Sequence, residues 1–317
     1  HGRHNGEDTM RKRAVIVGGA GFIGANLCEA LAEDNWHIAV IDNLSTGVNR
    51  DEVRALSDVF LEKDVTCLDK HEARFIFQGA DVVYNLVGRT WHGKSMTDPS
   101  GDAKVNVVAP LAVLEWAWIF GNHVIYTGTR GQYGRACILP VHEDSARNPI
   151  DINGINKQAA EDAHLLFAKH HETRATCLRL PNIFGPRHQT ETPDGVVNWF
   201  ITQALKGETI KVYGGMRDIL CVCEVVSALM RCVQRPECYG RVFNVGGRGM
   251  RLVEYARLVA AAAPTEVVET KPPQGCLEVG DFVSDSTAFQ EACGWDLSSS
   301  DIKDLIAEAV EWYREKS

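Results

Sequence analysis

Long apolar segments and an excess of positive charge are both missing from this chain of 317 residues. Because no stretch of about 18 consecutive apolar residues occurs, we expect no transmembrane helix and no membrane partner. The 33 basic residues are outnumbered by 42 acidic ones, which gives a net charge of −9 and argues against nucleic acid as a partner. Apolar residues make up 45% and charged residues 24% of the chain, values typical of a folded globular protein.

Signals for secretion and for metal binding are also missing. Residues 1–10 contain no apolar signal core, and we interpret them as a tag remnant or a mobile leader. The 10 cysteines lie mostly in apolar segments, and the only close pair, Cys221 and Cys223, has no second pair to complete a zinc site. We therefore expect buried free thiols, no bound metal and a reducing, cytoplasmic location.

Glycine is concentrated where an apolar run, residues 13–17, leads through residues 18–24 into a helical pattern. At such a strand-to-helix turn, glycines let a dinucleotide pyrophosphate approach the backbone, and the helix N-terminus attracts its charge. A second apolar run, residues 37–41, ends on Asp42, at about the spacing expected for the carboxylate that binds the adenosine ribose. The pattern predicts NAD rather than NADP, because Asp42 would repel a 2′-phosphate.

Strand and helix patterns then alternate along the chain. Strands are expected at residues 80–87, 123–127 and 174–180, and helices at 105–120, 156–171 and 301–314. Strands separated by helices of this length form a parallel sheet covered on both faces. The predicted fold class is α/β: a Rossmann doubly wound parallel sheet with a smaller C-terminal substrate-binding α/β region.

The regular alternation loosens after residue 180, where glycine and proline become frequent. We expect residues 11–180, together with about 218–246, to form the NAD-binding Rossmann domain. Residues 181–217 and 247–317 are expected to form the substrate-binding region.

Further motifs run along nearly the whole chain. They are Gly18 to Gly24, Asp42 to Gly47, Asp81 to Val87, Tyr126 to Gly134, Asn153 to Lys157, Leu180 to Arg187, Gly215 to Asp218, Phe243 to Gly246, and Gly294-Trp295. Together they make the chain resemble an extended short-chain dehydrogenase/reductase of the nucleotide-sugar epimerase and dehydratase family. The resemblance implies tightly held NAD and a nucleotide-diphosphate sugar bound against the C-terminal region.

The catalytic motif of this family is altered here. Members normally carry a Tyr four residues before a Lys, and the lysine lowers the pKa of the phenol that deprotonates the substrate. Lys157 is present, but Asn153 stands where the tyrosine is expected, and an amide cannot accept a proton near neutral pH. Thr129 matches the family's Ser/Thr position. Arg130 and Gly131 follow it, where members that eliminate water carry an acid pair.

Two residues are candidates to replace the missing tyrosine. Tyr133 lies four residues after Thr129, although its ring could instead simply pack near the site. His92 follows the strand at residues 80–87, at the end of the sheet where ligands bind, and histidine exchanges protons near neutral pH. The alternative for His92 is an exposed loop position.

The resemblance implies two further groups of site residues. Those facing NAD are Gly18, Gly21, Phe22, Ile23, Gly24, Asp42, Asn43, Asp64, Val65, Leu86, Lys157 and Pro181. Those facing the substrate are Arg89, Ser95, Thr129, Arg130, Asn182, Arg187 and Arg217. Guanidinium groups suit a diphosphate, but for Arg187 and Arg217 a structural ion pair stays open. Residues 278–281 lack the arginine common in the family, which leaves open a smaller substrate such as a nucleoside.

The sequence thus predicts an NAD-dependent epimerase of a nucleotide sugar or related nucleoside. The resemblance implies transient oxidation of a ring hydroxyl, with the hydride passing to NAD and later returning. Epimerisation is preferred to dehydration because Arg130 and Gly131 replace the acid pair. A dehydratase (lyase) and a catalytically silent NAD-binding sensor or scaffold are the alternatives. We also expect a homodimer formed through the helices at residues 105–120 and 156–171.

Overall fold

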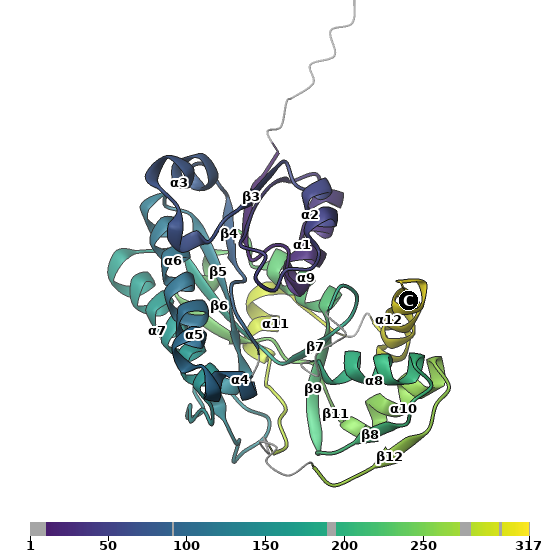
Figure 1. The fold of residues 1–317 in the computed structure, drawn as a ribbon. Coiled ribbons are helices and arrows are strands. Elements are labelled where there is room, and N and C mark those ends of the chain that lie inside the picture. Colours follow the sequence, from purple (N-terminus) through teal and green to yellow (C-terminus); the bar gives the residue numbers. More distant parts are fainter. Residues whose placement is uncertain (1–10, 91, 189–194, 273–279, 298–299, 317) are drawn as a thin grey trace, which may run out of the picture.

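The structure is a computed structural model that describes residues 11–90, 92–188, 195–272, 280–297 and 300–316, and the side chain of His92 is outside this description. The leader expected at residues 1–10 also lies outside the described residues. A large sheet with helices on both faces stands beside a smaller body that contains α8, α10 and α12 (Figure 1).

The large sheet has seven strands, all paired in parallel, in the order β10-β6-β5-β4-β1-β2-β3. Its strands are β1 (Arg13–Val17), β2 (His37–Asp42), β3 (Val59–Glu62), β4 (Val82–Asn85), β5 (His123–Thr129), β6 (Ala175–Leu180) and β10 (Arg241–Asn244). The chain changes direction across the sheet between β1 and β4. This switch point opens a crevice at the carboxyl ends of the strands, where ligands bind in such sheets. The predicted Rossmann fold is confirmed.

Helices cover both faces because the strands are apolar on both sides. The helices of the large sheet are α1 (Phe22–Glu33), α2 (Arg50–Leu56), α3 (Lys70–Phe77), α4 (His92–Thr97), α5 (Pro99–Ala103), α6 (Ala109–Ile119), α7 (Ile152–His171) and α9 (Val222–Arg231). Leu27 and Leu229 place α1 and α9 in the core on one face. Phe77 and Val113 place α3 and α6 in the core on the other face.

Two of the expected helices begin earlier than their apolar patterns suggested. The segment at residues 105–120 starts as a π-helical turn, Lys104–Val108, that continues directly into α6. Helix α7 starts at Ile152 because the Asp151 carboxylate accepts a hydrogen bond from the Gly154 backbone N–H at 2.7 Å and caps its first turn.

The smaller body has its own sheets and its own core. A three-stranded sheet contains β7 (Asn182–Phe184), β9 (Met216–Cys221) and β11 (Arg248–Arg251), and a two-stranded sheet pairs β8 (Ile210–Val212) with β12 (Val267–Glu269). Three helices pack around them: α8 (Val196–Leu205), α10 (Leu252–Ala262) and α12 (Ile302–Lys316). Phe184, Phe200 and Tyr255 are fully or almost fully buried in this core. The closing helix expected at residues 301–314 corresponds to α12.

One helix packs against a different core from the one predicted from the sequence. Helix α11 (Thr287–Cys293) was expected with the substrate-binding region, but it packs in the core of the large sheet. The Phe289 ring lies 5.5 Å from the ring of Phe243 on β10 and 5.5 Å from the ring of Trp295. The aromatic face of this short segment therefore covers the sheet. Among the described residues, no helix combines the length and apolar character needed to span a bilayer.

Candidate active site

The glycine-rich turn brings the N-terminus of α1 directly against β1. Gly18 has a φ of +87°, a conformation that glycine adopts without strain. A Cβ atom on Gly24 would lie 2.5 Å from the carbonyl oxygen of Gly18. The residue before α1, Gly21, has no side chain to cap the helix. The first-turn N–H groups of α1, which include those of Phe22 and Ile23, therefore present a positive potential suited to a pyrophosphate.

Asp42 ties this turn to the end of β2. Its carboxylate is 8% exposed and accepts hydrogen bonds from the backbone N–H groups of Ala20, at 2.9 Å, and Leu44, at 2.7 Å. Burial raises the pKa of Asp42, while these two hydrogen bonds oppose that rise. The acid predicted to bind the ribose thus lies beside the turn predicted to bind the pyrophosphate.

The neighbouring candidates for cofactor contact lie at the ends of β2 and β3. Asn43 donates a hydrogen bond to the Asp64 carboxylate at 2.9 Å. Asp64 also caps the short helix Val65–Cys67 by accepting a bond from the Thr66 backbone N–H at 2.9 Å. Asn43, Asp64 and Val65 therefore lie together next to Asp42.

Lys157 reaches from α7 to the ends of β4 and β5. Its Nζ atom lies 3.3 Å from the carbonyl oxygen of Val87 and 3.3 Å from that of Thr127. A Cβ atom on Gly88 would come within 2.3 Å of this Nζ, so the absence of a side chain there leaves room for the amine. Burial lowers the pKa of Lys157 to about 8, although the charge of Asp102 acts in the opposite direction. Lys157 is thus a buried amine that ionises close to neutral pH.

Two other predicted cofactor residues flank this crevice. The backbone N–H of Leu86 donates to the carbonyl oxygen of Val17 at 3.0 Å, and the carbonyl oxygen of Leu86 is the closest neighbour that a Cβ on Gly18 would meet, at 3.0 Å. Pro181 is buried directly after β6. Leu86 therefore lies between the glycine-rich turn and the segment that Lys157 contacts.

Asn153 lies one turn before Lys157 and is engaged in structure. It is 2% exposed, and its Nδ2 donates to the carbonyl oxygen of Arg89 at 2.7 Å and approaches Asp102 Oδ2 at 3.4 Å. The Arg89 backbone N–H donates in turn to Asn106 at 3.0 Å. Asn153 thus fixes the loop that follows β4.

Two residues of this cluster, Asp102 and Asn106, are not among the site residues predicted from the sequence. Asp102, which also accepts a hydrogen bond from Asn156 at 2.8 Å, is buried, and so is Asn106. These two residues are spaced by four, so they lie on one side of their helical segment. This spacing is the one sequence feature that could have identified the pair. It does not suffice, because polar residues in a helix usually face solvent.

Thr129 and Arg130 lie at the carboxyl end of β5. The Thr129 hydroxyl accepts a hydrogen bond from the Gly131 backbone N–H at 3.1 Å. The Arg130 guanidinium donates through Nε and Nη2 to Asn182 Oδ1 on β7, at 3.1 and 2.9 Å, and lies 5.1 Å from the ring centre of Phe282. Burial lowers the pKa of Arg130 to about 10, and the positive charge of Arg217 contributes to this shift. Arg130, Asn182 and Arg217 therefore form one cluster.

Arg217 comes from the smaller body, on β9. Its Nη1 donates to the carbonyl oxygens of Met216, at 2.7 Å, and Gly280, at 2.5 Å. Burial lowers its pKa as well. Within the described parts of the chain, neither Arg130 nor Arg217 is within ion-pair distance of a carboxylate. Two guanidinium groups placed together in this way are suited to bind an anion.

Arg187, in contrast, is committed to ion pairs. Its guanidinium lies 2.8 Å from Glu29 on α1 and 2.5 Å from Glu52 on α2, and it donates to Asn26 at 3.1 Å. These contacts tie the loop after β7 to the large sheet's helices. They favour the structural alternative for Arg187 over a phosphate contact.

Tyr133 is also part of a buried network. It is 2% exposed, and its hydroxyl donates to Asn244 Oδ1 at 2.8 Å and accepts a hydrogen bond from Arg179. Arg179 pairs with the buried Glu161 at 2.6 Å. Burial raises the pKa of Tyr133. These contacts favour the packing interpretation of Tyr133 over a role as proton acceptor.

Two remaining candidates lie on α4, which follows the loop of Arg89 and packs against α7. Ser95 is buried there. His92 begins the helix, but its side chain lies outside the described residues, so its role as a base stays a prediction. Residues 278–281 lack the arginine that the family resemblance implies, and residues 278 and 279 of this segment also lie outside the described residues.

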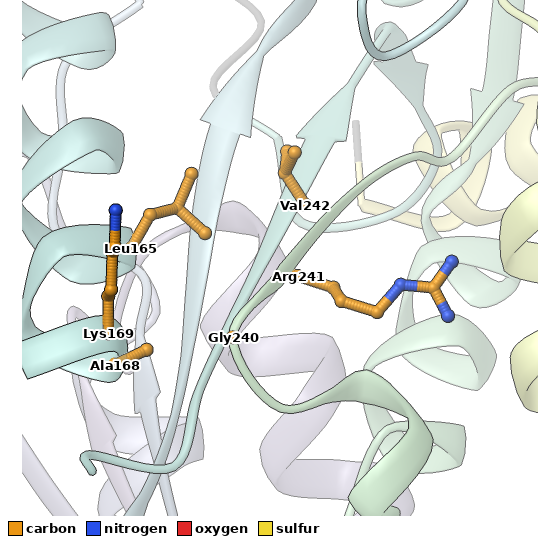
Figure 2. A pocket seen from close by; sticks show the side chains of 6 residues that line it. All are labelled: Leu165, Ala168, Lys169, Gly240, Arg241 and Val242. Atoms are coloured by element: carbon orange, nitrogen blue, oxygen red, sulfur yellow. The ribbon is translucent and has the colours of Figure 1, made fainter.

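A separate pocket lies far from this crevice. Leu165, Ala168, Lys169, Gly240, Arg241 and Val242 line it, between the last turns of α7 and the start of β10, and its volume is about 560 Å³ (Figure 2). Because α7 runs back along the sheet from Lys157, this pocket lies toward the amino ends of the strands. It has no part in the candidate site.

The fold and the site define an NAD-dependent enzyme of the extended short-chain dehydrogenase/reductase class. A family model described as "NAD dependent epimerase/dehydratase family" matches residues 14–246, and the chain belongs to this family.

Relatives and solved structures agree with this assignment over nearly the whole chain. A UDP-glucose 4-epimerase of Mycolicibacterium smegmatis is 30% identical, over 96% of this chain and 99% of its own. The structure of a UDP-glucose 4-epimerase of Thermotoga maritima with UDP-glucose matches with a TM-score of 0.86 and 28% identity, covering 96% of this chain and 99% of that one. The UDP-glucose 4-epimerase of Thermus thermophilus in complex with NAD matches with a TM-score of 0.83 and 27% identity, covering 96% and 100%.

Proposed function

We propose that this chain is a nucleotide-sugar epimerase in which Lys157 itself serves as the acid and base that the missing tyrosine usually provides. The observation that carries the proposal is the position of Lys157: a buried amine with a pKa of about 8, at the carboxyl ends of β4 and β5. Buried lysines with such a pKa act as general bases. Asn153 cannot take this role, since its amide is bound to Arg89 and has no basic form.

The residues of the glycine-rich turn and Asp42 fit the adenosine half of NAD, and Leu86 and Lys157 fit the side nearer the nicotinamide. When bound, NAD supplies a hydride acceptor and donor. The neutral amine of Lys157 accepts the proton of a substrate hydroxyl and later returns it. The hydroxyl of Thr129 orients that substrate hydroxyl by a hydrogen bond. Thr129 lies on β5 two residues after Thr127, whose carbonyl oxygen Lys157 contacts.

The arginine cluster supports a substrate with a diphosphate. Arg130 and Arg217 approach each other across the two bodies of the protein, and Asn182 holds the Arg130 guanidinium in place. The similarity to UDP-glucose 4-epimerases makes UDP-hexoses the first substrates to test. The absence of an acid pair after Thr129 supports epimerisation over elimination of water.

The test is turnover in heavy water. The NAD-loaded protein is incubated with UDP-hexoses, other nucleotide sugars and free nucleosides, and the products are separated by chromatography with mass detection. We expect a new peak of unchanged formula, with or without one deuterium, and none with Lys157→Met. A product that has lost water would make the enzyme a dehydratase.

A second candidate, an NAD-binding sensor without turnover, is favoured by one observation, the asparagine at position 153. The two functions differ in hydride transfer. Substrate labelled with tritium at the oxidised carbon transfers the label to bound NAD during epimerisation, whereas a sensor transfers none.

We further propose a homodimer formed through α6 and α7. Trp118, Ile119 and Leu166 on these helices are 41%, 50% and 56% exposed, a large apolar exposure for neighbouring helices. Light scattering coupled to size-exclusion chromatography should give twice the chain mass. Leu166→Glu should shift it to the monomer, while Val48→Glu, at an exposed apolar position of the loop after β2, should not.

A further inference from the structure

Three buried cysteines from separate segments bring their sulfur atoms together on the large sheet, away from the active site. Cys232 follows α9, Cys238 ends the short helix Pro236–Cys238, and Cys293 ends α11. Their sulfur atoms all lie within 4.8 Å of one another, and those of Cys238 and Cys293 are 3.1 Å apart. All three residues are fully buried. We propose that they form a binding site for one thiophilic metal ion, Zn²⁺ or Cu⁺.

The distances suit a shared ion. A zinc–sulfur bond is about 2.3 Å long, so three sulfur atoms on one ion lie roughly 3.8–4.0 Å apart. Small rotations of the side chains would bring the present arrangement to this spacing. Thiolate sulfur is a soft ligand that selects Cu⁺ and Zn²⁺ over harder cations. The other fully buried thiols of the large sheet, such as Cys28 and Cys177, are not part of this or any comparable group among the described residues.

The surroundings supply positive charge for such a site. Binding releases the three thiol protons to solvent, and one ion bound to three thiolates leaves a net charge of −1 with Zn²⁺ or −2 with Cu⁺. Arg235 acts electrostatically on both Cys238 and Cys293, and its positive charge offsets part of the thiolate charge.

The site would be structural, because it lies at the opposite end of the sheet from Lys157. Cys238 precedes β10, and its carbonyl oxygen accepts a hydrogen bond from Thr176 near the start of β6, at 3.0 Å. A bound ion would fasten α11 to α9 and to the sheet. The segment just before α11 carries Phe282, against which Arg130 lies in the candidate site. Metal binding would thereby stabilise the connection on which that contact depends.

The experiment is metal titration of the reduced chain. The protein is purified without oxygen in a non-thiol reductant, stripped with a chelator, and titrated with Zn²⁺ and, separately, with Cu⁺, each in competition with a chromophoric chelator. We expect one tightly bound equivalent per chain for at least one of the two ions, and a midpoint of thermal unfolding raised by several degrees. Co²⁺ used as a probe should give sulfur-to-cobalt charge-transfer absorption.

Cys238→Ala and Cys293→Ala should lose the bound equivalent and the thermal shift. The matched control Cys177→Ala, another buried thiol, should keep both, and so should the double variant Cys221→Ala/Cys223→Ala. Retained NAD binding verifies that each variant is folded. The proposal is overturned if the reduced wild type binds neither ion stoichiometrically, or if Cys238→Ala folds and binds as tightly as wild type. A Cys238–Cys293 disulfide in protein isolated without oxygen would equally overturn it.

Discussion

The side-chain amide of Asn153 donates a hydrogen bond to the carbonyl oxygen of Arg89, at a distance of 2.7 Å. This bond joins the first turn of α7 to the loop that leaves β4, one turn before Lys157. At the position where the sequence analysis expects the family's catalytic tyrosine, this chain therefore has a residue engaged in structural hydrogen bonds. The consequences can be measured separately for stability and for turnover.

Asn153→Ala should reduce stability more than chemistry. The substitution leaves the partly buried carbonyl oxygen of Arg89 without this partner, which costs about 1–3 kcal/mol in the free energy of unfolding. We expect kcat to fall by less than about tenfold, whereas Lys157→Met should lower it by a factor on the order of 10² to 10⁴. Denaturant unfolding and initial rates measure the two effects. An Asn153→Ala enzyme as inactive as Lys157→Met would instead place Asn153 in the chemistry.

The rate should depend on pH through Lys157. Burial lowers the pKa of this amine to about 8, and only its neutral form accepts a proton. Below this pKa the neutral fraction is small, so kcat should rise about tenfold per pH unit and level off above it. Rates measured from about pH 6 to pH 9.5 test this sign. A flat profile, or one that falls with rising pH, would contradict the assignment of Lys157 as the base.

Gly24→Ala should abolish retention of NAD. The added Cβ would lie 2.5 Å from the Gly18 carbonyl oxygen and 2.6 Å from Gly19 Cα, so α1 must move away from the turn. We expect a loss of about 1–3 kcal/mol in stability together with the loss of the cofactor. Gly93→Ala is the matched control, because a Cβ there meets nothing within 4 Å. Absorbance of NAD released on denaturation gives the occupancy of each variant.

Arg217→Ala and Arg187→Ala should affect different quantities. Arg217 lies in the arginine cluster, so its removal should raise KM for a nucleotide sugar by roughly tenfold or more, as expected for loss of a charged contact to phosphate. Arg187 pairs with Glu29 and Glu52, which are about half exposed, so its removal should cost about 1–3 kcal/mol of stability and leave KM nearly unchanged. A reversed pattern would assign the diphosphate to Arg187.

The large sheet could be predicted from local signals. The strands at residues 13–17, 37–41 and 123–127 are apolar runs, and the glycine-rich turn identifies the order of the first elements. The return of α11 to this sheet could not be predicted, because it depends on which of two cores receives Phe289. The sequence of a short apolar segment does not indicate against which hydrophobic core it packs.

The candidate site also contains both residues that local motifs predict and residues whose partners depend on tertiary packing. Lys157, Asp42 and the glycine-rich turn follow from spacing within short motifs. The network of Tyr133, Arg179 and Glu161 joins three elements, and the ion pairs of Arg187 join residues more than a hundred positions apart. Such partners are set by tertiary packing, so a single sequence leaves the structural and functional roles of these side chains open.

The path of α11 has a consequence for how the protein is made. Phe289 and Trp295 complete the core that β1 begins, but the ribosome synthesises them only after most strands and helices of the smaller body, α8 and α10 among them. The large sheet therefore emerges with part of its apolar face uncovered until residues 287–295 have been synthesised. Folding of the large sheet is thereby coupled to synthesis of the smaller body, and an N-terminal fragment that stops before residue 287 would expose the surface on which α11 rests and would be prone to aggregate.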